Sequence, residues 1–564
     1  MDQWLLPAWL DAAVGRRLEA LDTDGYSRRL WEADASLWKP DDEEHQRIVR
    51  ASLGWLSVFE GVRDQVPGLV EFVDELRGEG YRSTVLLGMG GSSLAPEVMR
   101  EVLGVREGYL DLHVLDSTDP AAVLAVEAAV DLETTLFVVS SKSGGTTETA
   151  SFHAYFYDRL RELDGEHAGR HFVAVTDEGT SLQREALDQG FRAVFVNPSD
   201  IGGRFSALSF FGMVPAALMG VDLERLLDGA RAVAVECGPD VPASENPALR
   251  LGAMLGEAAL AGRDKLTFVA EPRLRPLGAW VEQLVAESTG KDGTGIVPVD
   301  LEVLGDADAY GDDRVFVAVG LASVAATGHA GELMDLARAG HPVTGRELDD
   351  VYGLGGEFLR WEIAVATAGR ILGIDPFDQP NVQESKDNTK RLLAGYIASG
   401  ELLEDLPEGD GRLAYSVDDP DLPAALAEFL GQARPGDYVA LQAYVAPGVA
   451  VWDHLQALRL RIRDSLRLAT TLGYGPRFLH STGQLHKGGP NTGLFLQLIG
   501  QDPVDVDIPG QPYSFGVLKR AQARGDLGAL RAHGCRALRV DLGDDAAAGA
   551  EQLRAVLQGA LAVT

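Results

Sequence analysis

From about residue 81, short apolar runs alternate with segments of helical spacing. The first five runs of strand length are "STVLLG" (83–88), "LDLHVLD" (110–116), "TTLFVVS" (134–140), "HFVAVTD" (171–177) and "FRAVFVN" (191–197). Helix-like segments separate most of them. Strand-length runs that alternate with helices are typical of a parallel, doubly wound sheet. The pattern therefore predicts an α/β domain with a flavodoxin-like sheet.

A second alternation begins near residue 250. "DKLTFVAE" (264–271) and "DRVFVAVGL" (313–321) have the length of strands, whereas "LGAWVEQLVAES" and "GEFLRWEIAVATAGRIL" have helical spacing. An acidic stretch with Gly and Pro at 399–412 is typical of a linker or long loop. Beyond it come "GDYVALQAY", a basic amphipathic helix around "HLQALRLRIRDSLRLA", and "GLFLQLIG". Two alternating regions side by side indicate a duplicated architecture.

These patterns divide the chain into four parts. We predict a helical N-terminal segment over 1–80, a first doubly wound domain over 81–245, a second over 246–398, and a C-terminal α/β region over 399–564. A chain of 564 residues is too long for one ordinary core, which agrees with several domains.

The composition of the chain limits the kinds of partner and the location that we expect. The formal net charge of −35 repels phosphate backbones and anionic lipid, so we expect neither a nucleic acid nor a membrane partner. The two cysteines form no C-x-x-C pair, which fits a reducing cytoplasm. The start lacks a basic region before its apolar residues, and no apolar run is long enough to span a bilayer, so we expect a cytoplasmic location.

Two small-residue loops follow the first and third predicted strands. These are "GMGGSSLAPE" (88–97) and "SKSGGTTETA" (141–150). In a flavodoxin-like sheet the carboxyl ends of these two strands flank the topological switch point, where ligands bind. Glycines permit close backbone approach, and helix N-termini present free N–H groups to anions. The loops also supply hydroxyl donors from Ser92, Ser141, Ser143 and Thr146, with Lys142 as a charge. We therefore predict a phosphate site between the loops.

Other interpretations of the loops are weaker. Ser92 or Thr147 alone would more commonly cap a helix. Neither loop contains the G-x-x-x-x-G-K-[ST] string of a P-loop, and "GMGGSS" has Ser93 where a dinucleotide fingerprint has its third glycine. Asp116, at the end of the second strand, keeps a dinucleotide oxidoreductase open as an alternative.

Three later segments carry candidate chemistry. "SDIGGRFSALS" places Arg204 after two glycines, where its guanidinium suits an oxyanion. Glu287 falls in the last turn of a helix that Gly290 ends, a position open to a general base or to a solvated surface glutamate. "LHSTGQLHKGGPNTG" places His480 and His486 in a predicted Gly-rich loop. A two-histidine zinc site is conceivable, but no carboxylate or cysteine nearby completes the three or four ligands that zinc sites use, so we expect no metal.

Five strings in one order resemble the phosphoglucose isomerase family, whose members have two sugar-isomerase (SIS) domains. The strings are "GMGGSSLAP", "SSKSGGTTET", "GGRFS", "ESTGK" and "FDQPNVQESK". The C-terminal region with "HSTGQLHKGG" is similar to the isomerase part of bacterial transaldolase–phosphoglucose isomerase fusions. Through that subgroup the resemblance extends over nearly the whole chain.

The resemblance implies a sugar-phosphate substrate, with glucose 6-phosphate and fructose 6-phosphate interconverted through an enediolate without a metal or organic cofactor. It implies that Glu287 carries the proton between C2 and C1, and that Arg204 stabilises the enediolate. The remaining implied roles concern binding and ring opening: Gly91, Ser92, Ser141, Lys142, Ser143 and Thr146 at the phosphate, and Gln379 and Lys386 at the sugar.

One element of the family pattern is absent. The family's ring-opening histidine belongs to a "GQH"-type motif between the catalytic glutamate and the "FDQ…K" segment, and here that interval contains only His329 and His341. The local likeness "GQLHK" favours His486 for the role. In the family this histidine comes from the neighbouring subunit, so the resemblance implies a homodimer.

Other functions stay open at this level. A non-catalytic SIS-domain sensor of sugar phosphates would need the loops but not Glu287, Arg204 and Lys386 together. A dual phosphoglucose and phosphomannose isomerase would have the same motifs. Glucosamine-6-phosphate synthase is excluded, because its glutaminase half needs a cysteine where this chain has Asp2.

Overall fold

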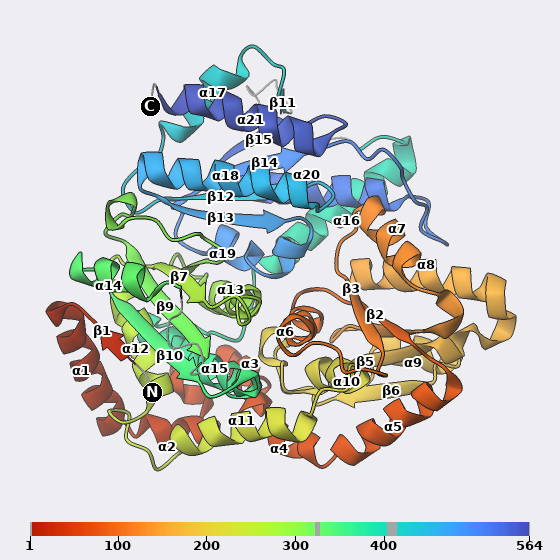
Figure 1. Ribbon diagram of the computed structural model, residues 1–564, viewed down its shortest axis with the longest axis horizontal. Helices are drawn as coiled ribbons and strands as arrows, with labels where there is room; N and C mark the ends of the chain where they lie inside the picture. The colour runs from red at the N-terminus through yellow and green to blue at the C-terminus, as the bar shows by residue number, and fades with distance from the viewer. Residues whose placement is uncertain (1–2, 322–327, 403–413, 563–564) are drawn as a thin grey trace.

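The computed structural model describes residues 3–321, 328–402 and 414–562, and three five-stranded sheets organise them (Figure 1). Most of the predicted linker at 399–412 lies outside the described residues. In the described ranges no helix combines the length and apolarity needed to cross a membrane.

The first sheet is wholly parallel and has the order β3-β2-β4-β5-β6. Its strands are β2 (Ser83–Leu87), β3 (Asp111–Leu115), β4 (Thr135–Ser140), β5 (Phe172–Asp177) and β6 (Ala193–Asn197). Every residue of β4 is buried, as expected for a central strand with helices on both faces. The order in chain sequence is 2-1-3-4-5, which confirms the predicted flavodoxin-like sheet.

The second sheet has the order β1-β10-β9-β7-β8. Its strands are β1 (Gln3–Leu5), β7 (Lys265–Ala270), β8 (Val297–Val299), β9 (Arg314–Leu321) and β10 (Val343–Leu348). Only β1 runs antiparallel, paired with β10. The N-terminal segment, predicted as helical, therefore also adds an edge strand to a sheet formed 260 or more positions later in the chain.

The third sheet is parallel, with the order β11-β15-β14-β12-β13. Its strands are β11 (Tyr415–Ser416), β12 (Tyr438–Tyr444), β13 (Ala469–Tyr474), β14 (Gly493–Ile499) and β15 (Arg536–Asp541). The C-terminal region is thus a third α/β sheet unit, with its own core around Leu441, Leu496 and Val540.

The helices fall into groups by sheet. The N-terminal group is α1 (Ala8–Thr23), α2 (Tyr26–Trp31), α3 (Glu43–Arg50), α4 (Val58–Arg63) and α5 (Val66–Glu79). The first-sheet group is α6 (Leu94–Leu103), α7 (Pro120–Ala129), α8 (Thr147–Asp164), α9 (Ser181–Asp188), α10 (Phe210–Leu218) and α11 (Leu223–Glu236). The second-sheet group is α12 (Pro247–Leu260), α13 (Leu277–Thr289), α14 (Ala330–Arg338) and α15 (Leu354–Leu372).

Helix α16 (Val382–Ser399) leads to the third-sheet group of α17 (Leu422–Leu430), α18 (Val449–Leu466), α19 (Gly483–Gly488), α20 (Phe515–Ala532) and α21 (Ala546–Leu561). Helices α16 and α20 pack together and extend toward α7 and α8 (Figure 1). Leu393 of α16 and Phe515 of α20 join the core that contains Phe152 of α8. The third unit is therefore docked on the first sheet through apolar contact.

Candidate active site

The two predicted phosphate loops meet because β2 and β4 are neighbours in the sheet. The Ser140 hydroxyl donates to the Ser92 carbonyl oxygen at 3.1 Å. Ser92 lies in a short 3-10 helix (Gly90–Ser92) that follows β2, and α8 begins at Thr147 just after the second loop. The convergence expected at the switch point is confirmed.

Hydroxyl groups of the second loop surround its turn. The Ser141 and Thr146 hydroxyls lie 3.1 Å apart, and Ser143 is exposed. Thr146 occupies the N-cap position of α8 without a side-chain bond to the helix, so the expected capping by Thr147 is wrong. Since neither hydroxyl caps the helix, the N-terminal N–H groups of α8 remain directed at the loop, where an anion is stabilised.

Lys142 points elsewhere. Its ammonium forms an ion pair with Asp177 at the end of β5 and donates to the Ser199 carbonyl oxygen at 3.1 Å. This pairing ties the loop to the neighbouring strand, so Lys142 supports the shape of the loop.

Two glycines allow three segments to pack closely at this point. A Cβ on Gly91 would lie 2.2 Å from the Gly203 carbonyl oxygen, and one on Gly90 would lie 2.7 Å from the His480 carbonyl oxygen. Gly90 also has a positive φ of 55°. Only glycine at both positions lets the loop touch the segment before Arg204 on one side and the third unit on the other.

Arg204 is buried, and each nitrogen of its guanidinium donates a hydrogen bond to the protein. Its Nε donates to the Ser288 hydroxyl at 2.7 Å and its Nη1 to Gln379 Oε1 at 2.7 Å. Its Nη2 donates to the carbonyl oxygens of Pro376 and Asp378, at 2.6 and 3.0 Å. The guanidinium is therefore a fixed positive charge, which costs no reorganisation when an oxyanion forms beside it.

Glu287 lies next to this charge, in the last turn of α13. Its Oε1 is 3.7 Å from Arg204 Nη1, and its Oε2 accepts from Gln283 Nε2 at 3.2 Å. Glu287 is 7% exposed. Gly290 follows the helix as its C-cap, as predicted. The structure thus brings a buried carboxylate and a fixed guanidinium together.

Lys291 belongs to the same network. Its ammonium donates to Asp378 Oδ1 at 2.7 Å. Burial, and then the charge of Arg204, lower the pKa of Lys291 to about 8. Lys291 and Arg204 both hold the Asp378 backbone, which fixes the segment that carries Gln379.

Lys386 and the phosphate loop line a common cavity of about 560 Å³. Lys386 lies on α16 and is exposed. Ser143 and Thr146 line the same cavity from the first unit, and His480 lines it from the third. Three parts of the chain that are far apart in sequence therefore face one space.

His480 contacts a carboxylate of the first unit. It lies in a 3-10 helix (Arg477–His480) after β13, and its Nε2 is 3.0 Å from Glu148 Oε1. Burial alone would raise the pKa of Glu148, but His480, the backbone N–H of the helix start and Lys386 hold it below its ordinary value. The His480 carbonyl oxygen accepts from Gln283 Nε2 at 2.7 Å, and this amide also reaches Glu287.

His486 occupies a different environment. The segment predicted as a loop forms the short helix α19, and the imidazole is buried between Phe478 and Phe495. Its Nδ1 lies 3.3 Å from Gln442 Nε2. Burial, and then Lys487, keep the pKa of His486 well below its ordinary value. These three contacts of the ring lie within the third unit, and His486 is not among the described residues that line the cavity of Lys386.

Sequence reasoning did not identify Glu148, and it considered His480 only for zinc. The available signal was a carboxylate in the first turn of α8, within "TTETA", and a second histidine six positions before His486. Nothing in the local sequence indicates that these two residues meet.

A different cluster is the one group of possible metal ligands among the described residues: His45, Asp375 and Asp378. The His45 Nδ1 lies 3.1 Å from Asp375 Oδ2, and the Lys291 ammonium already neutralises Asp378. Neither His480 nor His486 belongs to it.

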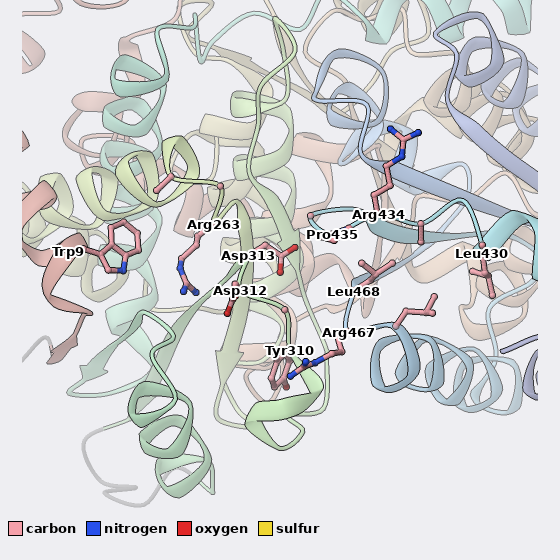
Figure 2. Close-up of a pocket in the computed structure, with 17 residues that line it drawn as sticks. Trp9, Arg263, Tyr310, Asp312, Asp313, Leu430, Arg434, Pro435, Arg467 and Leu468 are labelled. Carbon is pink, nitrogen blue, oxygen red and sulfur yellow. The ribbon is translucent and has the colours of Figure 1, made fainter. Parts of the chain in front are cut away.

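A larger cavity of about 1070 Å³ lies between the second and third units (Figure 2). Trp9, Arg263, Tyr310, Arg434 and Arg467 are among its lining residues. The predicted site residues are absent from its described lining. Size alone therefore does not locate the site.

A family model and several known proteins align with parts of this chain. A family model described as phosphoglucose isomerase matches residues 60–300, which include the phosphate loops, Arg204 and Glu287 but neither Lys386 nor His480. A glucose-6-phosphate isomerase of Rubrobacter xylanophilus is 28% identical over 66% of this chain and 98% of that protein. A probable glucose-6-phosphate isomerase of Natronomonas pharaonis is 30% identical over 64% of this chain and 92% of that protein.

Among solved structures, a glucose-6-phosphate isomerase from Chlamydia trachomatis has the same fold. The aligned region covers 71% of this chain and 87% of that protein, with a TM-score of 0.53 and 21% identity. Together with the relative that is 30% identical over nearly its whole length, these matches establish the family. The chain belongs to the phosphoglucose isomerase family.

Proposed function

We propose that this protein interconverts glucose 6-phosphate and fructose 6-phosphate by proton transfer between C2 and C1. The observation that carries the proposal is the pairing of Glu287 with the fixed guanidinium of Arg204, 3.7 Å apart, beside two converging phosphate loops. Abstraction of a proton next to a carbonyl needs a positioned base and a stabilised oxyanion, and these two groups supply both.

The base step uses Glu287. Its carboxylate takes the proton from C2 of the open-chain aldose, and the electrons of that C–H bond form the enediolate. The negative oxygen is stabilised by Arg204, whose four hydrogen bonds to protein keep it in place. The carboxylic acid then returns the proton to C1 while the hydroxyl proton passes from O2 to O1, so that C2 becomes the carbonyl carbon of the ketose.

Substrate binding uses the loop hydroxyls. We propose that Ser92, Ser141, Ser143 and Thr146 hold the phosphate with the N–H groups of α8, while Gly91 permits the close packing of the loop. Lys142 has its charge engaged by Asp177, so its part is to shape the loop. Binding of the remote phosphate holds the sugar in register with the base.

Ring opening is assigned to His480, with Gln379 and Lys386 at the sugar. The resemblance favoured His486, but that imidazole is buried among aromatic rings of the third unit. His480 instead faces the cavity shared with Lys386 and pairs with Glu148. A histidine oriented by a carboxylate is suited to moving a proton to or from the ring oxygen.

His480 and Glu148 belong to one chain. The third unit therefore supplies a group that the family takes from a neighbouring subunit. A homodimer remains a prediction from the resemblance. The contact within one chain supports a catalytic site that needs no residue from a partner.

The reaction would place the protein in the interconversion of hexose phosphates in glycolysis and gluconeogenesis. We also propose a cytoplasmic location, where its two cysteines, both free in the structure, stay reduced.

The test is a coupled assay without added metal, starting from fructose 6-phosphate and measuring glucose 6-phosphate. Mannose 6-phosphate run in parallel decides whether the protein is a dual isomerase. Turnover of fructose 6-phosphate is expected. Saturable binding of the sugar phosphate with no turnover would identify a sensor and reject the proposal.

A further inference from the structure

The carboxylate of Glu148 is contacted by a second side chain besides His480. Gln522, on α20, donates from its Nε2 to Glu148 Oε1 at 2.6 Å. Its own Oε1 accepts from the Thr118 hydroxyl at 2.8 Å. Gln522 is 3% exposed, Glu148 is 6% exposed and Thr118 is fully buried, so these three groups interact away from solvent. Buried hydrogen bonds of this kind rigidify the groups that they join.

The hydrogen bonds run in one direction, from Thr118 through Gln522 to Glu148. A carboxylate oxygen only accepts, so the Gln522 group that faces Glu148 is the NH₂ group. The amide oxygen therefore faces Thr118, whose hydroxyl donates to it. Both ends of the Gln522 amide are occupied, and the side chain cannot rotate without breaking both bonds.

Helix α20 is itself anchored beside Thr118. Lys519, one turn before Gln522, donates to Asp119 Oδ2 at 2.8 Å and also pairs with Asp502. Thr118 thus contacts Gln522 and Asp119 contacts Lys519. These two residues of α20 lie three positions apart, on one face of the helix. This double contact fixes the helix against the loop after β3, and with it the position of the Gln522 amide.

We infer that Gln522 is a positioning residue for ring opening: it holds the Glu148 carboxylate oriented toward His480. The inference rests on the proposed function. Without Gln522, Glu148 Oε1 loses one of the two side chains that contact it and the carboxylate can rotate. A freely rotating carboxylate no longer orients the imidazole.

The experiment is Gln522→Leu, assayed with glucose 6-phosphate that carries hydrogen or deuterium at C2. We expect kcat to fall about 10-fold, since an orienting group around an acid–base residue is lost. We also expect the C2 deuterium isotope effect to fall toward 1, because a slow ring opening hides the later cleavage of the C2 bond. A lower rate with the wild-type isotope effect would mean fewer active molecules and would overturn the inference.

A matched control is Gln442→Leu, which removes another buried glutamine of the third unit, one that contacts His486 instead of Glu148. Its isotope effect is expected to equal that of the wild type. An equal drop in both variants would show that any loss of packing in the unit has this result, against a specific role for Gln522.

A second variant keeps the inference testable if Gln522→Leu does not fold. In Gln522→Glu the new carboxylate repels Glu148 at high pH but donates again once protonated, so relative activity should recover as the pH falls. A pH profile parallel to that of the wild type would contradict the inference. Absence of turnover in the wild type would instead reject the proposed function itself.

Discussion

The site has two sides, one formed by Glu287 and Arg204 and one by His480 and Gln522, and the family model matches only the first. Glu287 and Arg204 lie within the residues that the family model matches. Gln283, one turn earlier on α13, holds Glu287, and Ser288 together with the segment 376–379 holds Arg204. His480 and Gln522 lie outside that range, on a third sheet unit docked against α8. The proposed proton transfer thus lies in the part that the family model matches, and the proposed ring opening lies outside it.

The contact between Glu148 and His480 shows how the third unit reaches the first. The carboxylate of Glu148 already lies at the start of α8, next to the phosphate loop. Any donor presented at that point would be oriented by it. The third unit presents His480 there from within the same chain, and buried polar contacts with the first unit hold it.

The largest effect is expected from Glu287→Gln, on the side that the family model matches. The amide cannot accept the C2 proton, so kcat should fall by about 10²–10⁴-fold while the fold is kept. Steady-state rates in both directions measure this. Activity close to that of the wild type would reject Glu287 as the base.

Arg204→Lys should reduce kcat by about 10²–10³-fold, because one ammonium cannot replace the guanidinium fork that holds Ser288, Gln379 and two carbonyl oxygens. The matched control is Arg192→Lys, where a surface arginine pairs with Glu79. Equal rates in the two variants would contradict a role for Arg204 at the enediolate.

His480→Asn tests the side that lies outside the range of the family model. We expect a loss of about 10–100-fold with glucose 6-phosphate, smaller than for Glu287 because some substrate opens without help. The C2 deuterium isotope effect should fall toward 1. A rate loss with an increased isotope effect would instead place His480 in the proton-transfer step.

The smallest effect on catalysis is expected from His486→Asn, with a rate within about 3-fold of the wild type, since the residue contacts only its own unit and Asn keeps an acceptor for Gln442. A loss as large as that of His480→Asn would restore His486 as the ring-opening group.

His486 should instead affect stability. Its pKa is well below 6.5 in the folded state and about 6.5 in the unfolded state, so the unfolded chain binds the extra proton as the pH falls. The free energy of unfolding of the wild type therefore falls, relative to that of His486→Asn, by up to about 1.4 kcal/mol for each pH unit below pH 6.5. Denaturant unfolding of both proteins at pH 7 and pH 5 measures the difference, and an unchanged difference would contradict it.

Local pattern was enough to predict the sheets and the loops. Apolar runs between helical segments determined the order of the first sheet, and the positions of Gly91 and Ser92 after one strand and Ser141 after its neighbour placed the loops together. These features depend on residues that are close in sequence or joined by strand pairing.

Contacts between distant units could not be predicted in this way. Whether His480 or His486 reaches the cavity depends on how β13 ends and on how α20 docks against Thr118. The motif "GQLHK" favoured His486, but the aromatic residues Phe478 and Phe495 enclose that imidazole in the fold. The edge strand β1 was missed for the same reason, because its partner β10 lies more than 300 residues away.

The central claim is that one chain supplies both Glu287 and His480 to the same site. The direct measurement is co-expression of Glu287→Gln with His480→Asn, followed by assay of the mixed protein. If both residues come from one chain, every site carries one defect, and the mixture should be no more active than its components. Recovery toward a quarter of the wild-type activity, as expected for random dimers with sites shared between subunits, would contradict the claim.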